Sequence, residues 1–141
     1  MATVKDILAK KGSFVASIGR EQTALEAAQL MNARRIGALV VLEGDHVVGI
    51  VSERDILTRV VAAQRDPATV TIAEIASSPV AVCHPGTTIG ECQSVMTGKR
   101  IRHLPVVDDK RLVGIVTTGD ILAQEMYTQQ ETIEYLHDYL Y

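Results

Sequence analysis

The amino-acid sequence contains the same pattern twice, 65 residues apart. Shifting the chain by that distance aligns Val15–Leu57 with Val80–Leu122 without a gap, and 16 of these 43 positions are identical. Self-similarity of this kind indicates a duplicated structural unit. One unit alone would leave an apolar sheet face uncovered. The two copies are therefore expected to pack about a pseudo-twofold axis, which would leave two symmetry-related clefts between them.

Each copy predicts the order strand, helix, strand, strand, helix. Thr23 with Glu26, and Thr88 with Glu91, form the Thr-x-x-Glu capping boxes that mark a helix start. Two apolar runs joined by a charged turn follow, as in a β-hairpin. The other predicted segments are extended stretches at Val15–Ile18 and Val80–Cys83, second helices at Asp55–Gln64 and from Asp120 to about Leu140, and short leading helices at Thr3–Ile7 and Thr71–Ile75.

These elements predict an α/β (α+β) fold in one compact module with an extended C-terminal helix. The linker Gln64–Thr69 contains Pro67, which stops the preceding helix. We therefore place the first unit at residues 1–66 and the second at residues 67–141.

Composition argues against several classes of protein. The net charge is −3 and Lys or Arg never occur in runs longer than a pair, which disfavours a nucleic-acid or anionic-membrane surface. No apolar stretch approaches the roughly 18 residues that span a bilayer, and the N-terminus lacks a signal-peptide core. Cys83 and Cys92 are expected as small core residues, and no pair of histidines has metal-ligand spacing. We expect a cytoplasmic protein without a bound metal.

The strings GIVSERD and GIVTTGD end the two hairpins and begin the helices that follow. Ser52 with Asp55, and Thr117 with Asp120, can be read simply as capping boxes with Asp in the place of Glu. They can also be read as a ligand site, because a helix N-terminus after a strand offers free N–H groups and partial positive charge to a phosphate. In that reading the hydroxyl holds phosphate oxygens and the aspartate accepts hydrogen bonds from ribose hydroxyls.

The two G-h-V-[ST]-x-x-D strings, the segments GALVV and RHLPVV, and the order of the repeats resemble a tandem cystathionine-β-synthase (CBS) domain pair, or Bateman module. The resemblance covers essentially the whole chain, which is similar to small stand-alone bacterial members. It implies that adenosine-containing ligands bind in the inter-repeat clefts and that chains pair into disc-shaped dimers.

The resemblance also implies which residues would form each cleft. One site would use Thr117, Gly119 and Asp120 for phosphate and ribose, with the adenine against Phe14, Val15, Ile36, Gly37 and Ala38. The other would use Ser52, Arg54 and Asp55, with Pro79, Val80, Ile101, Arg102 and His103 around the base or phosphate. His103 could instead be a structural histidine. Arg35, Lys99 and Arg100, at the ends of the first helices, either contact the ligand or simply complement the helix C-termini.

The C-terminal helix carries Ile133, Leu136, Leu140 and a Tyr135–Tyr139 pair. It either packs across its own domain or forms a dimer or partner contact, and we favour the latter. The predicted function is a non-enzymatic sensor of an adenine nucleotide, with AMP favoured over ATP, NAD and S-adenosylmethionine. The sequence predicts a homodimer through its CBS helices and C-terminal helix, and it leaves the downstream partner unidentified. The alternative is a structural dimerisation module without nucleotide.

Overall fold

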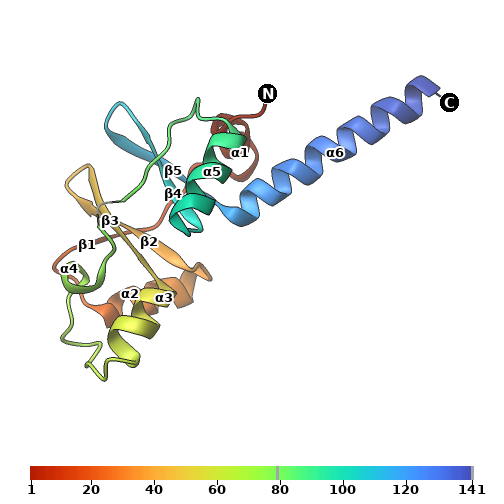
Figure 1. Cartoon of the computed structure of the whole chain (residues 1–141). Helices are drawn as coiled ribbons and strands as arrows, with labels where there is room; N and C mark the ends of the chain where they lie inside the picture. The colour runs from red at the N-terminus through yellow and green to blue at the C-terminus, as the bar shows by residue number, and fades with distance from the viewer. Residues whose placement is uncertain (79, 141) are drawn as a thin grey trace.

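The computed structural model describes residues 1–78 and 80–140, and it contains the duplicated unit as two lobes (Figure 1). The first lobe is built from β1 (Ser17–Gly19), α2 (Ala24–Arg34), β2 (Ala38–Glu43), β3 (His46–Ser52), α3 (Glu53–Ile56) and the π-helical turn η1 (Leu57–Val61). The second is built from α5 (Ile89–Lys99), β4 (His103–Asp108), β5 (Arg111–Thr117) and α6 (Thr118–Leu140). Two short helices precede the lobes in sequence, α1 (Val4–Lys11) and α4 (Ile72–Ile75).

The two sheets repeat the same register. In the first lobe β1 pairs in parallel with β2, and β2 pairs antiparallel with β3; in the second, β4 pairs antiparallel with β5. Both hairpins shift register at the equivalent place, between Val41 and Leu42 and between Val106 and Val107. The predicted extended stretch Val80–Cys83 is reduced to one parallel bridge, Cys83 to Val106. The mixed helix-and-strand fold predicted from the sequence is confirmed.

Capping residues begin the helices where the sequence placed them. The Thr23 and Thr88 hydroxyls accept hydrogen bonds from the N–H groups three residues on, at 3.2 and 3.1 Å. Helices α2 and α5 have Arg35 and Arg100 as their C-caps, and both residues adopt the left-handed conformation with φ of 54° and 55°. The second helix of the first lobe begins at Glu53 rather than Asp55, because Ser52 is its N-cap, and its π-helical turn ends at Val61.

The core of each lobe includes a short helix that lies outside the contiguous segment forming the rest of that lobe. Val4 and Ile7 of α1 are buried in the core of the second lobe, whereas Ile72 and Ile75 of α4 are buried in the core of the first. Figure 1 shows α1 beside α5, and an antiparallel bridge joins Thr3 to Thr88. The unit boundaries 1–66 and 67–141 stay a prediction, and the core packing crosses them.

The glycine shared by both hairpins explains how these segments approach the sheets. A Cβ at Gly49 would lie 3.0 Å from the Ser77 carbonyl oxygen, and one at Gly114 would lie 2.8 Å from Leu8 Cδ2. The backbone after α4 therefore presses on β3, and α1 presses on β5. This close approach brings the ends of α1 and α4 to the two strand-to-helix turns.

Candidate functional site

In the first lobe, the strand-to-helix turn is closed by reciprocal hydrogen bonds. The Ser52 N–H donates to Asp55 Oδ2 at 2.8 Å, and the Asp55 N–H donates to Ser52 Oγ at 3.2 Å. The Ser77 hydroxyl, which follows α4, donates to Asp55 Oδ1 at 3.5 Å. Arg59 Nε lies 4.0 Å from the same oxygen. Asp55 is thus a helix-capping acid that also meets the chain entering the second unit.

In the second lobe, the equivalent turn has the same capping hydrogen bonds, but a different side chain contacts its aspartate. The Thr117 N–H donates to Asp120 Oδ2 at 2.9 Å, and the Asp120 N–H donates to Thr117 Oγ1 at 3.1 Å. Lys11, the last residue of α1, places its ammonium 2.6 Å from Asp120 Oδ2 and donates to the Ile115 carbonyl at 2.9 Å. The two turns therefore differ in their nearest partners: the Lys11 ammonium contacts Asp120 directly, whereas Asp55 has the Ser77 hydroxyl and a more distant Arg59.

Sequence reasoning did not identify Lys11 as a member of this turn. The leading helices align only when three residues are gapped near Lys10–Gly12, so the 65-residue shift gives Lys11 no counterpart. An insertion that lengthens a leading helix by nearly one turn moves its last side chain further along the neighbouring strand. The unmatched three-residue insertion was therefore the sequence feature that could have pointed to Lys11.

The starts of β2 and β4 lie beside the turns of their own lobes. Ala38 pairs with Ser52, and His103 pairs with Thr117. The Glu53 N–H donates to the Gly37 carbonyl and the Thr118 N–H to the Arg102 carbonyl, both at 3.0 Å. The assignment of each strand start to the turn of the other lobe stays a prediction.

His103 has charged neighbours from both lobes. Burial lowers the pKa of its imidazole below the usual 6.5, and the nearby Arg102 and Lys11 lower it further. Glu53 of the first lobe and Asp120 of the second oppose this shift. The half-buried imidazole lies where the two lobes meet. Its lowered pKa favours the neutral form.

The remaining predicted site residues differ in exposure. Phe14 is exposed, with the Arg34 guanidinium 5.0 Å from its ring centroid. Gly119, Arg54 and Arg102 are also exposed, whereas Val15, Ile36, Val80 and Ile101 are half-buried. Pro79 lies outside the described residues.

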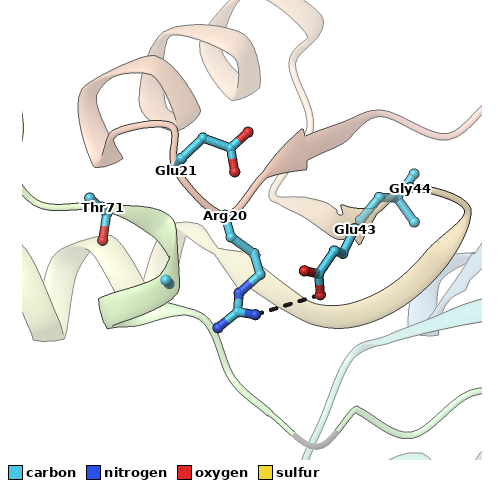
Figure 2. A pocket seen from close by; sticks show the side chains of 7 residues that line it. Arg20, Glu21, Glu43, Gly44 and Thr71 are labelled. Carbon is cyan, nitrogen blue, oxygen red and sulfur yellow. Dashed lines mark ion pairs between the residues drawn. The ribbon is translucent and has the colours of Figure 1, made fainter.

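Two surface hollows open on the first lobe, and neither includes the aspartates of the predicted site. One, of about 450 Å³, contains the predicted Ile36 and Gly37 and is otherwise lined by Ala28, Met31, Asn32, Arg35, Glu53 and Ile56. The other, of about 460 Å³, is lined by Arg20, Glu21, Leu42, Glu43, Gly44, Thr71 and Ala73. Figure 2 shows Arg20 reaching toward Glu43 across this second hollow, at 3.6 Å. Neither hollow contains the Ser/Thr and Asp pairs.

Within residues 1–78 and 80–140, no three His, Cys, Asp or Glu residues are grouped so that they could hold a metal ion. In the same part of the chain, none of the helices has the length and apolar character to cross a bilayer. Cys83 and Cys92 are free thiols buried in the core of the second lobe.

Comparison with known proteins finds the CBS-domain family twice. The family model for the CBS domain matches residues 4–62 and 72–126. The CBS domain-containing protein YhcV of Bacillus subtilis is 35% identical over 126 residues, covering 89% of this chain and 87% of that protein. A solved structure from Burkholderia ambifaria, provisionally described as a signal-transduction protein with CBS domains, is 34% identical with a TM-score of 0.87, covering 91% and 96% of the two chains.

A further solved structure is described as hypoxic response protein I with two coordinated zinc ions. It is 35% identical to this chain with a TM-score of 0.75, and the match covers 88% of this chain and 99% of that one.

Proposed function

The chain belongs to the CBS-domain family and contains a tandem pair of CBS domains, which form a regulatory module, and we propose that this module senses an adenine nucleotide. AMP is the favoured ligand. The observation that carries the proposal is the repeated turn in which a hydroxyl residue and an aspartate begin a helix directly after a strand. A helix N-terminus attracts a phosphate, and an ionised carboxylate accepts hydrogen bonds from neighbouring ribose hydroxyls.

Charge around Asp120 supports an anionic ligand there. Lys11 pairs with this acid, and Arg102 lies beside the same turn, where its carbonyl accepts from the Thr118 N–H. The turn therefore combines a carboxylate for ribose with the cationic Lys11 and Arg102 for phosphate. In the other turn, Arg54 and Arg59 stand near Asp55. We propose that Thr117, Gly119 and Asp120 form one site and Ser52, Arg54 and Asp55 the other, with no catalytic residue in either.

The experiment that tests this proposal is calorimetric titration with AMP, ATP, NAD and S-adenosylmethionine on nucleotide-stripped protein. Asp120→Asn and Asp55→Asn are the informative variants, because an amide oxygen still accepts the cap hydrogen bond while the charge is lost. Each is expected to weaken binding at its own turn by about tenfold to a hundredfold. Glu91→Gln is the matched control, since Glu91 caps α5 and has no assigned ligand role.

The capping hydrogen bonds of the two aspartates favour a second candidate function. Both aspartates already satisfy backbone N–H groups at their helix starts, so the turns are structurally complete without a ligand. In this alternative the chain is a dimerisation module. Absence of heat from all four ligands, with the protein folded, would support it and contradict the sensor.

We also propose that the chain forms a homodimer. The support is a pair of exposed apolar side chains at equivalent helical positions in the two repeats. Leu57 and Val61 are 60% and 62% exposed, and Leu122 and Met126, 65 residues later, are 58% and 61% exposed. Exposed apolar side chains that gather on one face often mark an interaction surface.

A further inference from the structure

Helix α6 leaves the body of the protein after its first turns. Ile121 and Gln124 are buried, and Lys10 holds this end of the helix, with its ammonium 3.0 Å from Gln124 Oε1 and 3.1 Å from the Tyr127 ring centroid. From residue 128 to residue 139 every side chain is exposed, and Figure 1 shows the helix projecting away from both lobes. Helices of about 12 residues are only marginally stable alone in water. This segment therefore needs a packing partner.

One face of the projecting helix has the spacing of a coiled-coil seam. We name this face the heptad stripe, and it consists of Leu122, Met126, Gln129, Ile133 and Leu136, which are separated by four, three, four and three residues. Its apolar members are between 46% and 61% exposed. At 100° per residue the stripe is about 80° wide, and it points away from the face that contains the buried Ile121 and Gln124.

The distribution of charge on α6 identifies the partner. Glu131, Glu134 and Asp138 lie on the side of the helix opposite the heptad stripe, and α6 contains no Lys or Arg. A basic partner helix would require acids beside the stripe, where coiled coils place their interchain ion pairs. The positions that flank the stripe are instead Ala123, Gln130 and His137 on one side and Glu125, Thr132 and Tyr139 on the other. Glu125 is the single carboxylate among them, so a second identical helix can approach without a row of like charges.

We propose that α6 pairs with α6 of a second copy in a parallel, two-stranded coiled coil through the heptad stripe. Ile133 and Leu136 occupy the two kinds of seam position. A β-branched residue at the first and Leu at the second favour a parallel coiled coil of two helices. In the parallel arrangement Gln129 faces its own copy, and the two amides can hydrogen-bond to each other. In an antiparallel arrangement Gln129 would face apolar side chains and lose that partner. The pairing rests on the homodimer proposed above, whose surface it shares at Leu122 and Met126, and it does not depend on nucleotide binding.

The test is site-specific disulfide formation in the full chain. Leu136→Cys places a thiol on the seam, where parallel, in-register helices bring it against its copy. Tyr135→Cys is the matched control, one residue away and off the stripe. We expect rapid oxidation of Leu136→Cys to a covalent dimer, at least about tenfold faster than Tyr135→Cys, because the seam holds the thiols at high effective concentration. The native cysteines are buried and provide the background measurement.

A second variant separates the coiled coil from any contact between the lobes. Ile133→Glu, combined with Leu136→Cys, buries a charge in the seam and should abolish the rapid crosslink, whereas Tyr135→Glu with Leu136→Cys should retain it. Sedimentation and circular dichroism of the same variants verify that the body remains folded. Equal crosslinking rates at positions 135 and 136, a crosslink that survives Ile133→Glu, or a monomeric wild-type chain at high concentration would each overturn the proposal.

Discussion

Lys11 Nζ lies 2.6 Å from Asp120 Oδ2, so the last residue of the first helix partly neutralises the acid that begins the last helix. The side chains are 29% and 21% exposed, which places the ion pair near the surface of the protein. Asp55 instead has the Ser77 hydroxyl at 3.5 Å and the more distant Arg59 Nε at 4.0 Å. The duplicated sequence has therefore produced two turns with the same caps and different electrostatics.

The first prediction concerns the competition between Lys11 and a ribose for Asp120. Adenosine has no phosphate to attract the ammonium, so its hydroxyls must share the carboxylate with Lys11. Because pairs near the surface contribute about 0.2 to 1 kcal/mol, Lys11→Ala should tighten adenosine binding by up to about fivefold. Calorimetry measures this change, with the exposed Lys5→Ala as the control for loss of charge. Weaker adenosine binding in Lys11→Ala would show that Lys11 contacts the ligand favourably.

The second prediction separates the capping role of Asp120 from its proposed ligand role. Asp120→Ala removes the acceptor for the Thr117 N–H and the charge at the helix N-terminus, and should cost about 0.5 to 1 kcal/mol of unfolding free energy. Asp120→Asn retains the acceptor and should cost less. Urea unfolding of both variants gives the difference. Equal destabilisation by Ala and Asn would mean that the charge, rather than the hydrogen bond, stabilises this turn.

The sequence predicted the fold well because the signals were local. Thr23 and Thr88 mark helix starts by capping chemistry, and both hairpins follow from apolar runs joined by charged turns. Confirmation extends to the tandem CBS pair and the C-terminal helix. The sequence predicted an extended stretch at Val80–Cys83, where the structure has a single bridge from Cys83 to β4. A short apolar stretch does not reveal how far it will run alongside the adjacent strand.

The candidate site was less accessible to sequence reasoning. The repeated Ser52 and Asp55, and Thr117 and Asp120, were found because duplication exposed them. Lys11 was missed because its position depends on how α1 packs across the second lobe, which is tertiary information. Periodicity reports the contacts within an element, whereas contacts such as Lys11 with Asp120 join residues 109 positions apart.

The third prediction uses Glu74, which closes the capping box of α4. Its carboxylate accepts from the Thr71 N–H at 2.7 Å and from Arg65 Nη2 at 2.8 Å, and these bonds lower its pKa from 4.5 to about 2. The stabilisation by the charged form is complete above pH 4.5 and is lost as the pH falls toward 2. Unfolding measured across this range should show a smaller loss of stability in Glu74→Gln than in wild type. Asp45→Asn, in the exposed hairpin turn, should retain the wild-type slope.

The last prediction links His103 to phosphate recognition. Burial and the neighbouring Arg102 keep the pKa of its imidazole below 6.5, so the free protein carries it mainly neutral near neutral pH. An anionic phosphate placed beside it would favour the protonated form, as any nearby opposite charge does. Binding of AMP should therefore take up a fraction of a proton, and binding should tighten as the pH falls below neutrality.

Calorimetry in buffers of different ionisation enthalpy measures this proton uptake. His103→Gln retains a hydrogen-bonding side chain without a titratable ring, so the uptake should fall while the phosphate's own protonation stays the same. Adenosine provides the complementary control, because it has no phosphate to raise the imidazole pKa. Equal proton uptake for AMP in wild type and His103→Gln would place the phosphate away from His103, and the histidine would then serve only the packing where the two lobes meet.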